Sequence, residues 1–111
     1  MGEDAMTVIV MTTWEGTPAA IERLVEGARG AATVHSEMGA KNIRLLRSSV
    51  GGDPARAHYY AEFDSHAAYG AFTDKMMTSD WWKQLREATA EGHPDIRIAA
   101  TALYYDALAT P

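Results

Sequence analysis

The stretch IRLLRSSVGGDPARAHYYAEF, residues 43–63, predicts a β-hairpin at the centre of the chain. Its two arms, residues 43–48 and 56–63, are rich in apolar and aromatic side chains, as half-buried strands are. Between them, residues 51–54 read Gly-Gly-Asp-Pro, a sequence typical of a turn. Because a hairpin makes its two strands antiparallel neighbours, this stretch places the second and third strands of one sheet.

A strand and then a helix are predicted before the hairpin. Residues 6–14 are apolar and β-branched, and both faces of this strand carry apolar side chains. Thr17 and Pro18 are typical of a helix start, and apolar residues then recur at helical spacing for several turns. Gly27 and Gly30 interrupt the helix. Each costs about 1 kcal/mol relative to alanine, and we expect them to permit a bend or a close approach to the sheet.

A broken helix and a last strand are predicted after the hairpin. Asp64 and Ser65 can cap the helix, residues 78–80 interrupt it and restart a second segment, and residues 92–94 end that segment. The last strand is predicted over residues 96–105. The order is therefore β-α-β-β-α-β. It predicts an α+β fold in which helices cover one face of a four-stranded antiparallel sheet.

Length and composition bound the class of protein. The 111 residues predict a single domain over residues 1–111, with an ordered core from about residue 6 to residue 106. The 47% of hydrophobic residues is typical of a globular chain rather than a disordered one.

Charge and missing residue types exclude several functions. The net charge of -5 repels phosphate and anionic lipid, so we expect neither nucleic acid nor membrane as a partner. The acidic start, residues 1–4, is unlike a secretion signal, and we expect a cytoplasmic protein. The chain has no cysteine, which excludes disulfides and thiolate sites. No dinucleotide or phosphate-loop motif is present, and we expect no cofactor and no metal.

The strands look apolar on both faces, whereas two helices can cover only one face. The last strand is also long for an edge position and carries only Arg97 as a charge, so it would aggregate if exposed. We therefore expect a homodimer formed through the open face of the sheet.

This arrangement resembles the dimeric α+β barrel superfamily over nearly the whole chain. The resemblance rests on the element order, on the helix end at residues 37–40 and on the broken second helix between residues 64 and 82. It is nearest to NIPSNAP-like and uncharacterised bacterial branches, through residues 50–54 and 59–63, and more distant from antibiotic-biosynthesis monooxygenases. It implies that two ferredoxin-like protomers pack sheet against sheet. Haem-degrading members carry an asparagine on the first strand, and this chain has only Asn42.

A polar row on the third strand is the first candidate site. His58, Tyr60 and Glu62 alternate along the strand and therefore project on one face. They are candidates to line a pocket, with His58 transferring a proton and Tyr60 and Glu62 contacting a substrate. The alternative is that they meet water or cross-strand partners such as Arg44 or Arg47.

Further candidates lie on the helices and on the outer strands. His35 falls on the apolar stripe of the first helix, either as a core or boundary histidine with one hydrogen bond or as an acid or base facing a pocket. Trp14, Trp82 and Tyr104 are candidate substrate contacts, and the alternative for each is packing or a dimer contact. Trp81 fits the core stripe.

Three functions stay open at this point. The chain could bind a small apolar or aromatic molecule in a pocket between helices and sheet. It could be a cofactor-independent monooxygenase or isomerase of an aromatic or polyketide-like compound. It could also be a purely structural dimer. A cavity of about 300 Å³ or more would favour the first two functions over the third.

Overall fold

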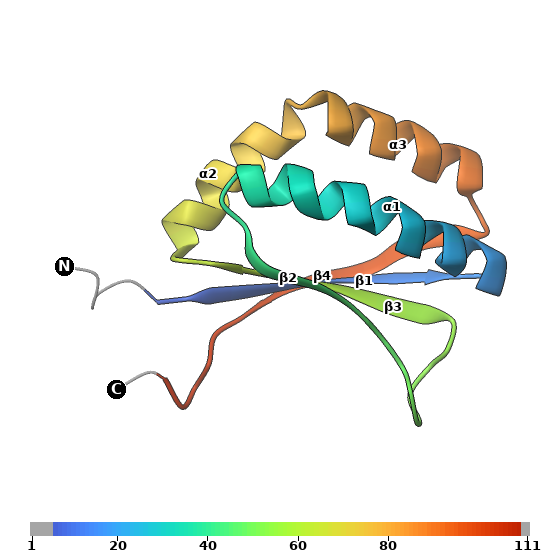
Figure 1. Cartoon of the computed structure of the whole chain (residues 1–111), viewed down its shortest axis with the longest axis horizontal. Helices are drawn as coiled ribbons and strands as arrows, with labels where there is room; N and C mark the ends of the chain where they lie inside the picture. Colours follow the sequence, from blue (N-terminus) through green and yellow to red (C-terminus); the bar gives the residue numbers. More distant parts are fainter. Residues whose placement is uncertain (1–5, 110–111) are drawn as a thin grey trace.

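The computed structural model describes residues 6–109 and shows a sheet whose helices all lie on one face (Figure 1). The acidic start at residues 1–4 lies outside this range. In chain order the elements are β1 (Val8–Gly16), α1 (Pro18–Glu37), β2 (Lys41–Arg47), β3 (Arg56–Phe63), α2 (His66–Met77), α3 (Asp80–Gly92) and β4 (Ile96–Tyr104). The predicted element order and the predicted break in the second helix are confirmed.

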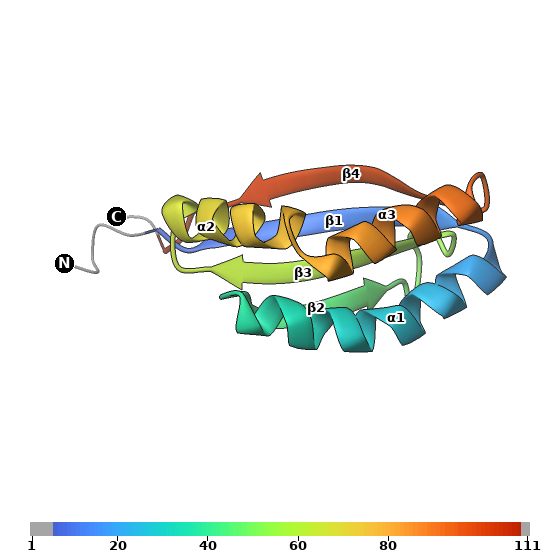
Figure 2. The same cartoon turned by 90° about the horizontal axis from the view of Figure 1, so that it is seen from above.

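The four strands are antiparallel and lie in the order β2-β3-β1-β4. β4 is therefore an edge strand, as the sequence predicted. Seen from the helix side, α1 lies along the β2 side of the sheet, and α2 and α3 follow one another beside it over the middle strands, with α3 reaching β4 (Figure 2).

Each helix begins at a side-chain cap. Thr17 Oγ1 accepts a hydrogen bond from the backbone N–H of Ala20, with a distance of 3.2 Å. Ser65 caps α2 in the same way, and Ser79 starts α3 directly after the break. Such caps satisfy backbone N–H groups that the first turn leaves unpaired. Among residues 6–109 we find no helix that has both the length and the apolar character needed to cross a membrane.

One of the two roles expected for the glycines of α1, a close approach to the sheet, is not found. A Cβ atom added at Gly27 or at Gly30 would meet no atom within 4 Å, so neither glycine is needed for a close approach to the sheet. The close approach lies elsewhere, at Gly16, where an added Cβ would lie 2.5 Å from the carbonyl oxygen of Asp95. That contact lets the end of β1 pass the start of β4.

The core lies between the helices and the inner face of the sheet. Val8, Val10 and Trp14 of β1 point toward the helices and are buried. Phe63 at the end of β3 is 2% exposed and packs against Phe72 of α2, with ring centroids 4.7 Å apart. These contacts fix α2 to the sheet.

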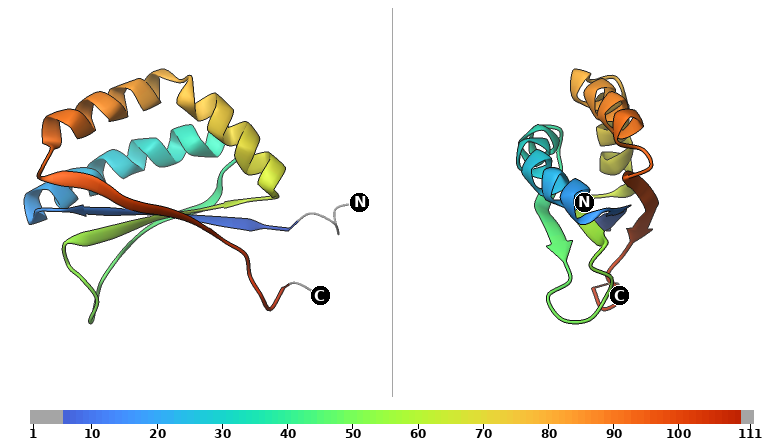
Figure 3. Two further views of the ribbon diagram at one scale, coloured as in Figure 1. Left: turned by 180° about the vertical axis from the view of Figure 1, so that it is seen from behind. Right: turned by 90° about the vertical axis from the view of Figure 1, so that its right-hand side faces the viewer.

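The outer face of the sheet carries no helix (Figure 3). Apolar side chains lie there on β1 and β4, including Met11, Ala102 and Tyr104. β3 is the exception on this face, because its outer side chains are the polar row of His58, Tyr60 and Glu62. The outer face is therefore mainly apolar over β1 and β4 and polar over β3, with Leu46 of β2 as a further apolar side chain.

A β-bulge in β4 changes the direction of its later side chains. Trp14 pairs with Ile98 and Thr13 pairs with Ala100, which leaves Ala99 as an extra residue. An extra residue reverses the alternation of side chains beyond it. Thr101 therefore faces the helices, whereas Tyr104 faces outward.

Candidate functional site

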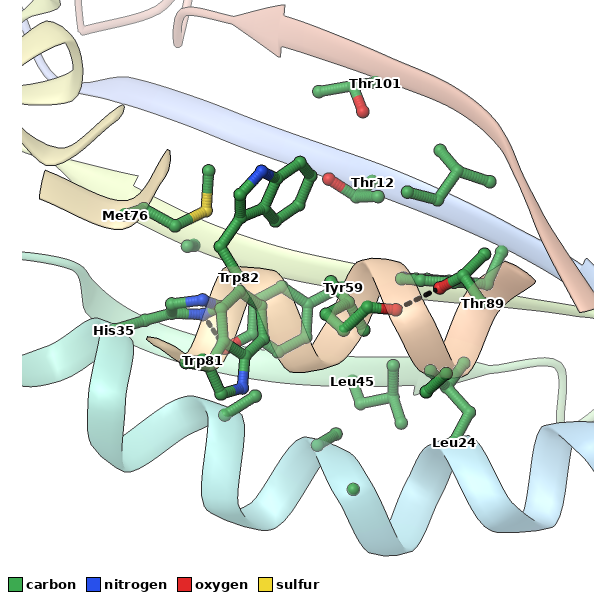
Figure 4. Close-up of a pocket in the computed structure, with 18 of the residues that line it drawn as sticks. Thr12, Leu24, His35, Leu45, Tyr59, Met76, Trp81, Trp82, Thr89 and Thr101 are labelled. Atoms are coloured by element: carbon green, nitrogen blue, oxygen red, sulfur yellow. Dashed lines mark hydrogen bonds between the residues drawn. The ribbon is translucent and has the colours of Figure 1, made fainter. Parts of the chain in front are cut away.

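A cavity of about 560 Å³ lies between α1, α3 and the inner face of the sheet (Figure 4). Its walls are mainly apolar and aromatic. All three tryptophans of the chain, Trp14, Trp81 and Trp82, line it. The volume is within the range of ordinary small-molecule sites, about 300 to 1,000 Å³.

Small side chains and a loosely packed helix produce the cavity. Several wall residues have little or no side chain: Ala20, Gly27, Ala28, Ala31, Ala61 and Ala88. No residue of α3 is buried, although Leu85, Thr89 and Gly92 face the cavity. An amphipathic helix is normally stabilised by burying its apolar face. In this protein that face borders open space.

His35 is the buried polar residue of the site. It is 6% exposed, and its ring lies edge-on to Trp81, with centroids 4.3 Å apart. Its Nδ1 atom lies 2.7 Å from the hydroxyl oxygen of Tyr59. Its Nε2 atom is buried and has no hydrogen-bond partner among the described residues. Most buried polar atoms in folded proteins do have a partner.

Burial keeps both members of this pair uncharged at neutral pH. It lowers the pKa of His35 to about 4 and raises the pKa of the Tyr59 hydroxyl above its usual value. Since the phenol keeps its proton, we assign its O–H as the donor to Nδ1, which places the imidazole proton on Nε2. A base with a pKa near 4 is poorly matched to proton transfer at neutral pH.

The two members of the His35–Tyr59 pair are expected to contribute to stability together and not independently. His35→Leu and Tyr59→Phe each leave a buried polar atom unpaired, and each should lower the free energy of unfolding by about 1–3 kcal/mol. The double variant should lose less than the sum, by about 1 kcal/mol or more. Urea denaturation measures all three. Additive losses would show that the pair is not coupled.

The predicted polar row of β3 lies on the opposite face of the sheet from the cavity. His58 Nδ1 is 2.9 Å from Thr13 Oγ1, and the Tyr60 hydroxyl donates to Glu62. Glu62 also accepts from Asn42, and the guanidinium carbon of Arg44 lies 5.6 Å from the centroid of the Tyr60 ring. Of the two cross-strand partners that the sequence suggested, Arg44 lies against Tyr60, whereas Arg47 pairs with Glu22 of α1.

The structure therefore divides the predicted site residues between two faces. His35, Trp14 and Trp82 line the cavity. The row of His58, Tyr60 and Glu62 lies on the outer face, and Tyr104 joins it there because of the bulge. Their assigned roles as catalytic or substrate-binding residues stay predictions.

Sequence reasoning missed the cavity residues Tyr59, Thr12 and Thr101. A signal for Tyr59 was present, because Ala57, Tyr59, Ala61 and Phe63 alternate with the polar row. The more apolar set of an alternating strand normally faces the core. Thr101 had no such signal, since its direction depends on the bulge.

Asp64, directly after the end of β3, forms an ion pair with Lys41 of β2. Lys41 Nζ lies 2.9 Å from Asp64 Oδ1. Within residues 6–109 we find no group of three or more histidine and carboxylate side chains placed to hold a metal ion.

Comparison with known structures places the fold. An antibiotic biosynthesis monooxygenase candidate from Nitrosomonas europaea superposes with a TM-score of 0.67 at 14% identity, over 96% of this chain and 96% of that chain. The chain has the ferredoxin-like α+β fold. A NIPSNAP domain protein from Burkholderia xenovorans shares it, with a TM-score of 0.64 at 9% identity over 89% and 91% of the two chains.

A second monooxygenase candidate, from Deinococcus radiodurans, has a TM-score of 0.66 at 13% identity over 87% and 89% of the two chains. No protein-family model and no curated protein sequence matches the chain. The predicted resemblance to NIPSNAP-like and monooxygenase-like structures is thus confirmed for the fold. At these identities a shared fold does not define a shared activity.

Proposed function

We propose that the protein binds a small, uncharged apolar or aromatic molecule in the cavity between α1, α3 and the sheet. The cavity itself supports the proposal, because its volume of about 560 Å³ exceeds the size that self-filling interiors leave open. Arg23 is the charged residue among the described residues that line it, and it lies on the exposed side of α1. An ionic ligand would therefore lack a buried counter-charge.

Catalysis is the second candidate function for the same cavity. Two structural neighbours are antibiotic biosynthesis monooxygenase candidates, which supports a monooxygenase as this second function. The sequence-based alternative is a cofactor-independent monooxygenase or isomerase of an aromatic or polyketide-like compound. We favour binding because the low pKa of His35 makes this residue a weak base at neutral pH. A purely structural dimer would leave the cavity without a ligand.

Blocking the cavity from α1 tests the binding proposal. Gly27 lines the cavity and Gly30 does not, and both positions have room for a Cβ atom. Gly27→Leu should weaken binding of the uncharged fluorescent probe N-phenylnaphthylamine by about tenfold or more, which is 1.4 kcal/mol. Gly30→Leu gains the same helix propensity and should bind the probe like the wild type.

Fluorescence titration of the three proteins measures the effect. If the wild type shows no saturable binding of the probe, the binding proposal is wrong and a filled, structural interior becomes the better account. Equal binding of the probe by both leucine variants would mean that the probe binds at another surface and not in the cavity.

We also propose that two copies pack the outer faces of their sheets together. Met11 lies at the centre of this face, and Leu46 and Tyr104 are 42% and 54% exposed in the single copy. The same face carries Arg44 and Glu62. A two-fold contact can bring each of these charges opposite its counterpart from the other copy. A cytoplasmic location is part of this proposal, as the lack of cysteine suggests.

Sedimentation velocity at micromolar concentration tests the dimer. Met11→Glu buries a charge in the proposed contact and should give a monomer. Met77→Glu, at a position on α2 that is 56% exposed, should leave the dimer intact. A wild-type monomer would refute the dimer alone, because one copy forms the whole cavity.

A further inference from the structure

Two unpaired hydroxyl groups lie side by side in the wall of the cavity. Thr12 of β1 and Thr101 of β4 are directly opposite each other across the antiparallel pair, and both line the cavity (Figure 4). Among residues 6–109 neither hydroxyl has a hydrogen-bond partner; Thr12 is half-buried and Thr101 is exposed, so both can be reached from the open side of the cavity. By contrast, Thr13 pairs with His58, and the hydroxyl of Thr89 donates to the carbonyl of Leu85.

The bulge at Ala99 is what brings these hydroxyls together. Without the extra residue, the regular alternation would turn Ala100 toward the helices and Thr101 outward. Bulges often redirect a side chain beside a functional site. Valine has the same shape as threonine and the same preference for strands, so packing alone does not require a hydroxyl at the half-buried Thr12.

We propose that Thr12 and Thr101 together bind a carbonyl oxygen of an uncharged aromatic ligand. This inference rests on the proposed binding function and adds the polar group that the ligand must carry. Directly opposite residues of an antiparallel pair have Cβ atoms about 4.5–5.5 Å apart, so two hydroxyls can donate to one acceptor. A carbonyl oxygen has two lone pairs for this purpose.

The surroundings favour a flat aromatic body for the rest of the molecule. Trp14 and Trp82 line the same cavity and offer large flat surfaces for contact with an aromatic ring. A few placed polar groups in an otherwise apolar pocket normally fix the orientation of a ligand. We therefore expect an aromatic ketone or quinone to bind with its carbonyl at the β1–β4 side.

Fluorenone and fluorene test the inference, because they differ mainly in the carbonyl group. Their affinities are measured by displacement of N-phenylnaphthylamine from the wild type, from Thr12→Val/Thr101→Val and from Thr13→Val. The ratio of fluorenone to fluorene affinity should fall by about tenfold in the double variant, since two hydrogen bonds are lost. It should stay unchanged in Thr13→Val, whose side chain lies on the outer face.

Taking the ratio within each protein cancels the different solvation of the two compounds in water. Fluorene binding to the double variant shows whether its cavity is intact. An infrared spectrum of fluorenone bound to the wild type gives a second readout, with a carbonyl stretch at lower frequency than in an apolar solvent.

The outcomes separate this inference from the binding proposal. If fluorene and fluorenone bind but their ratio is the same in all three proteins, or if the carbonyl stretch is unshifted, the role of the threonines is refuted and the binding proposal stands. If neither compound displaces the probe from the wild type, both proposals fail for this class of ligand.

Discussion

Replacing Phe63 with alanine is expected to lower the free energy of unfolding by about 3–5 kcal/mol, a large part of the stability of a domain of this size. Phe63 is 2% exposed and lies where β3 meets α2. Its ring contacts Tyr69 and Phe72, with centroids 5.2 and 4.7 Å away. Loss of the ring removes apolar contact and leaves a cavity that the sheet and helix cannot close.

Urea denaturation followed by far-ultraviolet circular dichroism measures the loss. Met77→Ala is the matched control on α2, because Met77 is 56% exposed, and it should change the free energy of unfolding by less than about 0.5 kcal/mol. A loss of less than about 1 kcal/mol for Phe63→Ala would mean that the contact between α2 and the sheet is not part of the core.

The second large effect is a loss of stability in acid that depends on His35. Burial lowers the pKa of His35 from 6.5 to about 4 in the folded protein. Between these two values the unfolded chain binds more protons than the folded one, so stability rises with pH across this window. Above about pH 6.5 His35 is neutral in both states, and stability does not depend on its protonation. As the pH falls from 6.5 toward 4, the unfolded chain takes up the proton first, and the free energy of unfolding decreases. The decrease amounts to at most about 3 kcal/mol.

His35→Gln should remove this part of the pH dependence. His66→Gln, which changes an exposed histidine at the start of α2, should keep it. The pKa values of Glu15 and Glu62 are also lowered. The largest cause is a hydrogen bond from Arg97 for Glu15 and from Tyr60 for Glu62. The contributions of these two carboxylates are lost at lower pH and are common to all three proteins. Parallel curves of stability against pH for the wild type and His35→Gln would contradict the assignment.

The fold was predictable because its signals are local. Thr17, Ser65 and Ser79 mark helix starts by short side chains that cap the next backbone N–H groups. The central hairpin is marked by Gly51 and Gly52, both of which adopt positive φ angles in the structure. Such patterns act within a few residues, so the sequence alone reveals them.

The site was less predictable because it depends on which way each strand faces. The row of His58, Tyr60 and Glu62 was correctly placed on one face, but the helices cover the other face. For Tyr104, strict alternation from Ile96 predicts the helix side, and the bulge at Ala99 reverses it. The cavity itself depends on how far α3 stands from the sheet, which no short pattern encodes.

The most direct test of the account is fluorine NMR of the protein labelled with fluorotryptophan. The chain has three tryptophans, and all of them line the cavity. We predict that titration with fluorenone shifts all three resonances in a saturable way, with one dissociation constant. If the three resonances do not move, a ligand site between α1, α3 and the sheet is contradicted. This holds whether fluorenone binds elsewhere or does not bind at all.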